Sequence, residues 1–117
     1  MGKIMAEIDV YEQYFAAEAE YNGVKRHGAK VLLTSVSGEG NIRYDMSVIF
    51  FPHNDEEDYA VSYDAVFTET VYEGKGRRSR KREEKLLEGL RGKIDEISFE
   101  NGGRVDWERP LREARRG

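Results

Sequence analysis

Residues 42 to 50 show the strictest hydrophobic alternation in the chain, and this alternation limits the folds that the chain can adopt. Arg43, Asp45 and Ser47 are polar, and the side chains between and beside them are apolar. The apolar set consists of Ile42, Tyr44, Met46, Val48 and Phe50. Because successive side chains of a β-strand point to opposite faces, the pattern predicts a strand with one buried and one exposed face. Antiparallel sheets covered on one side are built from such strands.

Two further strands are expected to flank this one. Residues 31–34 alternate in the same way, and the loop at 37–41 has the length and composition of a hairpin connection. Residues 52–58 contain a proline and four adjacent acids, which do not continue a strand, so they predict a second hairpin loop. Residues 59–71 alternate again and predict a third strand.

Residues 4–21 are expected to form a helix before the first strand. Apolar side chains recur there at helical spacing, and Asn22-Gly23 supplies a stop in the left-handed conformation. The recurring residues are Ile4, Ile8, Tyr11, Phe15 and Ala19. A second helix is expected to begin after Ser79, which is the best N-cap in this region. Its buried stripe would consist of Leu86, Leu87, Leu90, Ile94 and Ile97.

The sequence therefore predicts a single α+β domain over residues 1–117, with the order α-β-β-β-α. Both helices would cover the apolar face of a three-stranded antiparallel meander. The helices and the meander together would form the core of the domain, over residues 4–97. Residues 98–117 would form a tail, with a fourth strand or short hairpin near 97–107 and a brief helix from Pro110. Trp107 in this tail would either fill the edge of the core or anchor a dimer.

Charge is strongly segregated along the chain. Residues 75–82 contain six cations and no anion, so the net charge of −4 combines +6 on this run with −10 on the other 109 residues. Residues 1–73 carry fourteen acids against five bases. They include the unbroken acidic run Asp55, Glu56, Glu57 and Asp58. A largely anionic body repels bare nucleic acid and suits basic partners.

The basic run is expected to bind an anion, because it lies where the second helix would begin. Free N–H groups and the helix dipole attract phosphate or carboxylate at a helix N-terminus, and guanidinium groups add charge-assisted hydrogen bonds. The residues of this partner- or phosphate-binding site would be Lys75, Arg77, Arg78, Ser79, Arg80, Lys81 and Arg82. Tyr72, expected on the polar face of the third strand, would lie beside them as a stacking residue. The alternative is that Glu83, Glu84 and other acids of the same chain neutralise the run.

Gly74, Gly76, Ser79, Arg80 and Lys81 resemble, with one residue inserted, the signature that opens the second helix of the double-stranded-RNA-binding domain. The predicted element order is also similar to that family. The resemblance implies phosphate contacts to duplex RNA at the start of the second helix. Glu83 and Glu84 depart from the pattern, and the acidic body lacks the separated basic patches of a duplex reader.

In size, charge and predicted architecture the chain also resembles small acidic anti-CRISPR proteins, which are phage or mobile-element inhibitors of host defence. This resemblance implies a non-catalytic protein that occludes a nucleic-acid-handling partner. Residues 55–58 would imitate phosphates, and the basic run would grip an acidic patch or a guide backbone. The expected partner is a protein or nucleoprotein complex, with direct nucleic-acid binding as the alternative and a small enzyme as a third possibility.

Catalytic and membrane functions are not expected. The chain has no cysteine, and its two histidines, His27 and His53, lie in predicted exposed loops. The sequence carries no nucleophile motif, no metal-binding motif and no signal for a cofactor. Charged residues interrupt the first fifteen positions, so neither a signal peptide nor a membrane span is expected there, and the expected compartment is the cytoplasm.

Overall fold

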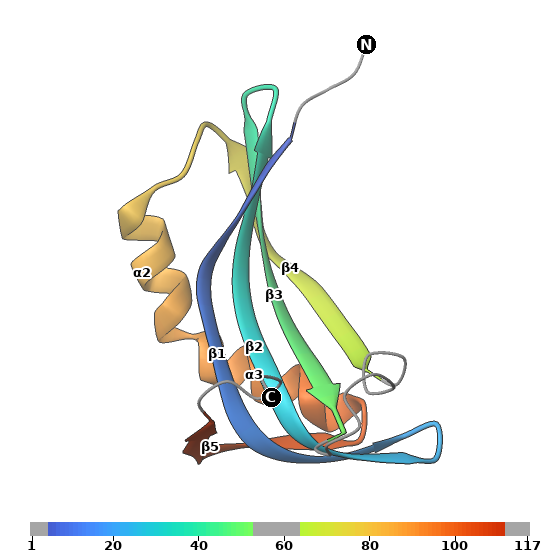
Figure 1. The fold of residues 1–117 in the computed structure, drawn as a ribbon. Helices are drawn as coiled ribbons and strands as arrows, with labels where there is room; N and C mark the ends of the chain where they lie inside the picture. Colours follow the sequence, from blue (N-terminus) through green and yellow to red (C-terminus); the bar gives the residue numbers. More distant parts are fainter. Residues whose placement is uncertain (1–4, 53–63, 112–117) are drawn as a thin grey trace.

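The computed structural model describes residues 5–52 and 64–111, and strands dominate its fold (Figure 1). Four strands come first along the chain, and two helices and a fifth strand follow them. The elements are β1 (Ala6–Tyr21), β2 (Val24–Gly38), β3 (Asn41–Phe51), β4 (Ala65–Lys75), α2 (Arg80–Glu88), α3 (Leu90–Glu100) and β5 (Gly103–Leu111). The strands form one antiparallel sheet in the order β4-β3-β2-β1-β5.

The predicted order α-β-β-β-α is therefore wrong, because the segment expected to be the first helix is the strand β1. The cause is a β-bulge at Val10. Ile8 lies opposite Ser35 and Tyr11 lies opposite Leu33, so β1 advances three residues while β2 advances two. The extra residue brings Ile8 and Tyr11 to the same face of the sheet. Their spacing therefore matches a helix although the backbone is extended.

Asn22 and Gly23 form the turn between β1 and β2 rather than a helix stop. Their φ angles are 53° and 77°, and both lie in the left-handed region. A two-residue turn with positive φ at both positions matches the right-handed twist of the strands on either side, and Asn-Gly is its preferred sequence. The sequence thus indicated the correct backbone conformation, but in a hairpin.

The prediction for residues 42–50 is confirmed. They lie in β3, between β2 and β4, and the five apolar side chains are buried on the face that bears the helices. The predicted hairpin at 37–41 is also confirmed. Its turn residues Glu39 and Gly40 have φ angles of 53° and 80°. Of the third predicted strand, residues 65–71 belong to β4, whereas residues 59–63 lie outside the described residues.

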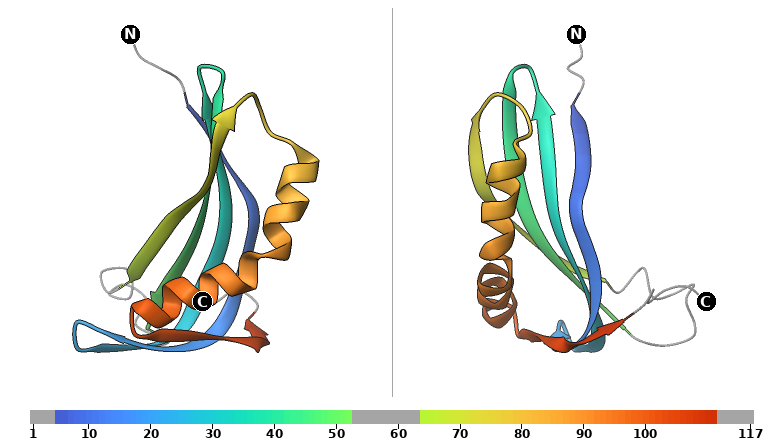
Figure 2. Two further views of the ribbon diagram at one scale, coloured as in Figure 1. Left: turned by 180° about the vertical axis from the view of Figure 1, so that it is seen from behind. Right: turned by 90° about the vertical axis from the view of Figure 1, so that its left-hand side faces the viewer.

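Both helices lie on the same side of the sheet (Figure 2). Leu90, Ile94 and Ile97 of α3 are buried there against the apolar side chains of the sheet. The single helix predicted after Ser79 is instead two helices, because the chain bends at Gly89. Leu86 and Leu87 of α2 are only partly buried, since α2 stands further from the sheet than α3.

The strand β5 completes the sheet by pairing with the second half of β1. Pro110 lies opposite Phe15 in this ladder, so the helix predicted from Pro110 is wrong for the two described residues of that segment. Trp107 fills the edge of the core: its ring packs against Phe15 with centroids 4.8 Å apart, and its Nε1 donates to Asp95 Oδ1 at 2.9 Å.

Neither helix of the described residues has the length and hydropathy needed to cross a membrane.

Candidate functional site

The strongest candidate site is the exposed basic surface where β4 leads into α2. We use "basic surface" for six side chains, all of them exposed: Lys75, Arg77, Arg78, Arg80, Lys81 and Arg82. In Figure 1 they belong to the end of β4, the connection after it and the first turn of α2. One dense cluster of cations therefore lies at the end of the sheet where β2 and β3 also turn.

The backbone of this connection is held in place by a neighbouring hairpin. Gly76 has a φ of 106°, a conformation that residues with a side chain rarely adopt. Its N–H donates to the carbonyl oxygen of Gly40 at 2.7 Å. The basic segment is thereby attached to the β2–β3 turn.

Ser79 is the N-cap of α2, as predicted from the sequence. Its backbone is extended, its Oγ accepts a hydrogen bond from Arg82 N at 3.2 Å, and its carbonyl oxygen accepts from Glu83 N at 2.9 Å. A capped start fixes the direction of the helix, and other N–H groups of its first turn have no partner within the helix. The helix dipole then adds to the positive field of the side chains.

A hydrogen-bonded cluster of Tyr44, Arg78 and Glu83 attaches the start of α2 to the sheet. Arg78 donates from Nε to Glu83 Oε2 at 2.8 Å and from Nη2 to Glu83 Oε1 at 2.9 Å. The Tyr44 hydroxyl donates to Glu83 Oε2 at 2.7 Å and accepts from Ser79 N at 3.3 Å. Tyr44 and Glu83 are both buried. The cluster connects β3, the connecting loop and α2.

This cluster shifts the pKa values of its members in the direction expected for an ion pair. Hydrogen bonds from the Arg78 guanidinium hold the pKa of Glu83 below its ordinary value, against the opposing effect of burial. Hydrogen bonds to Glu83 in turn raise the pKa of Arg78. Burial, helped by the adjacent carboxylate, raises the pKa of Tyr44. The charge of Arg78 is therefore neutralised by Glu83 within the same molecule.

Arg82 is also engaged, but with an aromatic ring. Its guanidinium carbon lies 3.8 Å from the ring centroid of Tyr72, within the range of a cation–π interaction. The sequence placed Tyr72 on the polar face, which is wrong. A bulge at Val71 puts Tyr72 opposite Tyr44 on the face that bears the helices. Gly74 makes room for Tyr72, because any Cβ there would collide with its ring and hydroxyl.

The remaining four cations, Lys75, Arg77, Arg80 and Lys81, form no ion pair with any residue of the described chain. Among the described residues, internal neutralisation of the basic run takes the form of an ion pair at Arg78, and the charge of Arg80 also helps to lower the pKa of Glu83. Four unpaired cations beside a capped helix start can bind phosphate or carboxylate groups through charge-assisted hydrogen bonds.

The interface predicted from the sequence also includes an acidic run. Asp55, Glu56, Glu57 and Asp58 lie outside the described residues, so their role as phosphate mimics stays a prediction.

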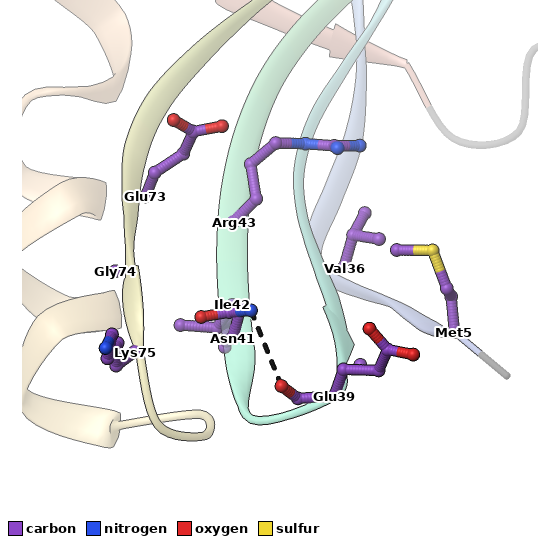
Figure 3. Close-up of a pocket in the computed structure, with 10 residues that line it drawn as sticks. Met5, Val36, Glu39, Asn41, Ile42, Arg43, Glu73, Gly74 and Lys75 are labelled. Carbon is purple, nitrogen blue, oxygen red and sulfur yellow. Dashed lines mark hydrogen bonds between the residues drawn. The ribbon is translucent and has the colours of Figure 1, made fainter. Parts of the chain in front are cut away.

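A hollow of about 540 Å³ lies next to the basic surface (Figure 3). Met5 and Lys75 lie on opposite sides of it, and Val36 and Ile42 contribute apolar surface. Its charges are of both signs, because Glu39 and Glu73 line it together with Arg43 and Lys75. Arg43 is already bound to Asp45, with Nε 3.1 Å from each carboxylate oxygen. The charges that line this hollow therefore favour neither an anionic nor a cationic ligand.

His27 is the one histidine among the described residues. The His27 side chain is exposed, and its Nδ1 lies 3.8 Å from Glu18 Oε1, too far for a hydrogen bond. His53 lies outside the described residues. The described chain also contains no group of three His, Asp or Glu side chains placed to hold a metal ion.

Sequence reasoning missed the role of Glu83, although a signal for it exists. Glu83 precedes Leu86, Leu87 and Leu90 at helical spacing, so it belongs to the stripe that faces the sheet. A carboxylate on a buried stripe requires a cation and a hydrogen-bond donor. The basic run supplies several cations near Glu83, and the one that binds it, Arg78, lies five residues earlier, whereas Tyr44 is 39 positions away and gives no local signal.

Comparisons of the chain with protein-family models, with curated proteins and with solved structures find no match. The resemblance to the double-stranded-RNA-binding domain loses its topological part, because the chain does not have the order helix, three strands, helix. The pattern from Gly74 to Lys81 remains, and the structure explains Gly74, Gly76 and Ser79 by local packing, backbone conformation and helix capping.

Proposed function

We propose that this chain is a non-catalytic binding protein that inhibits a nucleic-acid-handling partner by occupying its surface, like the anti-CRISPR-type proteins that it resembles in size and charge. The observation that carries the proposal is a set of four exposed cations that form no ion pair with any described residue: Lys75, Arg77, Arg80 and Lys81. Cations in one rigid cluster are suited to an acidic patch or a bound phosphate backbone on a partner.

Direct binding of nucleic acid is the second candidate, and the capped start of α2 favours it because helix N-termini bind phosphate. The charge distribution of the chain makes direct nucleic-acid binding less favourable than binding to a protein or nucleoprotein partner. Outside the basic run the chain carries a net charge of −10, which repels an extended polyanion. A compact contact at one patch avoids most of that repulsion.

Affinity capture from a cell extract, performed with and without nuclease treatment, tests the proposal. The bait is the full chain, and the test variant combines Arg77→Glu, Arg80→Glu and Lys81→Glu. Acids are favourable in the first turn of a helix, so the variant is expected to fold. The matched control reverses three other exposed cations, Lys25, Arg104 and Arg109, with the same change in net charge.

We expect the unmodified chain and the control to retain a protein partner after nuclease treatment, and the test variant to lose it. Capture should also weaken as salt rises, because the contacts are exposed ion pairs. Capture of nucleic acid alone would support the second candidate instead. Equal capture by the test variant and the unmodified chain would refute a role for the basic surface.

A further inference from the structure

Among the described residues, no strand pairs with the outer edge of β1 over its first half. The strand β5 pairs with β1 only from Tyr14 to Ala19, so in the described chain residues 6–13 of β1 are hydrogen bonded to β2 alone. Every second N–H and C=O of such an edge points away from the sheet and is available to another strand. In Figure 1 this is the upper half of β1.

The helix α2 lies on the helix-bearing side of the sheet (Figure 2), and it contacts the sheet at Tyr44 of β3 and Tyr72 of β4. Leu86 and Leu87 of α2 are only partly buried. A strand added to the first half of β1 would extend the sheet on the side away from β4 and would leave these contacts of α2 in place.

The two faces of this edge differ in chemistry. On the helix-bearing side, Ile8 is 40% exposed and Tyr11 is partly buried. On the other side lie three acids, Glu7, Asp9 and Glu12, as their pairing with Val36, Thr34 and Leu32 of β2 shows. Side chains of an added strand lie beside those of β1 on the same face. The edge thus matches a strand that alternates apolar and basic side chains.

The acids are incompletely neutralised by the described chain. Glu12 Oε2 lies 3.3 Å from Lys30 Nζ, and Asp9 Oδ1 accepts a hydrogen bond from Thr34 at 3.4 Å. Glu7 forms no ion pair with another described residue. A second copy paired through the same edge would bring these acids against one another, which is unfavourable for like charges on directly opposed strand positions.

We propose that residues 6–13 of β1 bind an extended peptide segment of a partner protein, one with alternating apolar and basic side chains, by strand addition. The apolar side chains contact Ile8 and Tyr11, and the basic ones contact Glu7, Asp9 and Glu12. This surface shares no residue with the basic surface. Failure of either proposal therefore leaves the other standing.

Fluorescence anisotropy with short labelled peptides tests strand addition directly. The probe is a peptide of about eight residues that alternates arginine and valine, long enough to span the edge. Two further peptides carry N-methyl groups on alternate residues, one on the arginines and one on the valines. A peptide docked on an edge uses only every second N–H, so we expect one methylated peptide to bind like the parent and the other to lose binding.

The variant Glu7→Lys should weaken binding of the unmethylated peptide by about threefold to tenfold, since an attraction becomes a repulsion. The matched control, Glu100→Lys, changes another exposed acid and should leave binding within about twofold. Equal binding of both methylated peptides would show simple charge attraction and would overturn the proposal. So would a dimer of the chain whose sedimentation changes with Glu7→Lys, because a second copy would then occupy the edge.

Discussion

Glu83 is the residue on which the orientation of α2 depends most. Its carboxylate accepts three hydrogen bonds, two from Arg78 and one from Tyr44, and it is buried. The Tyr44 hydroxyl also receives the N–H of Ser79, so the helix cap and the carboxylate share one anchor on the sheet. A charged acid at this position is therefore a structural requirement, although the surrounding sequence is basic.

Replacing Glu83 with glutamine should lower the free energy of unfolding by about 1–3 kcal/mol at neutral pH, because hydrogen bonds to a charged group are lost. The lower part of that range is expected, since the Arg78 side chain is 41% exposed. The measurement is urea unfolding of the two proteins. Glu84→Gln, an exposed neighbour, is the control and should leave stability nearly unchanged.

The same pair of proteins should show a defined pH dependence. The folded pKa of Glu83 lies below its ordinary value of 4.5, so the stability that its charge provides is present above that value. As pH falls through the folded pKa this stability is lost. The difference in unfolding free energy between the two proteins should therefore shrink in acid. A difference that stays constant from neutral pH to pH values well below 4.5 would contradict the ion pair.

At the scale of elements, β3 was predictable from its sequence and β1 was not. The alternation of residues 42–50 is unbroken, so the period of two was visible. In β1 the bulge at Val10 changes which residues face the core, from even to odd numbers, and produces a false helical spacing. The alanine- and glutamate-rich end of β1 also favours a helix intrinsically, and pairing on both sides overrides that preference.

The misplacement of Tyr72 has the same cause, since the bulge at Val71 reverses the faces of the last residues of β4. Bulges insert a residue without a composition signal, and so a face assignment made before a bulge fails after it. The basic surface was predictable because consecutive residues and a helix cap define it. The Tyr44–Glu83 contact was not, because it joins β3 to α2 through space.

The helix α2 should be less protected than α3. Its attachment depends on the Tyr44, Arg78 and Glu83 cluster and on Arg82 over Tyr72, whereas α3 buries Leu90, Ile94 and Ile97. Ser79→Ala should remove about 1 kcal/mol from the stability of α2 by deleting its N-cap hydrogen bond. Hydrogen exchange should then speed up in α2 and not in α3. Ser37→Ala, in the β2–β3 hairpin, is the control.

At the scale of the molecule, the last described strand, β5, pairs with the first one. It pairs with β1, and residues as far apart as Ala16 and Asp106 are partners in that ladder. Phe15 and Trp107 then pack together at the edge of the core formed with α3. The last strand is therefore expected to form with the rest of the sheet rather than after it, as one cooperative unit.

Trp107 is the single tryptophan of the chain, so its fluorescence reports on β5 and α3 while far-ultraviolet circular dichroism reports on the whole sheet. The two signals should follow the same urea transition if the domain unfolds in one step. Ile94→Ala, which removes a fully buried side chain, should lower the free energy of unfolding by about 2–5 kcal/mol and shift both signals equally. If the fluorescence changed at lower urea than the dichroism, β5 would unfold before the rest of the sheet. The domain would then not unfold as a single cooperative unit. A coincident shift would mean that removing a core side chain of α3 lowers the stability of the whole sheet, including residues 6–13 of β1.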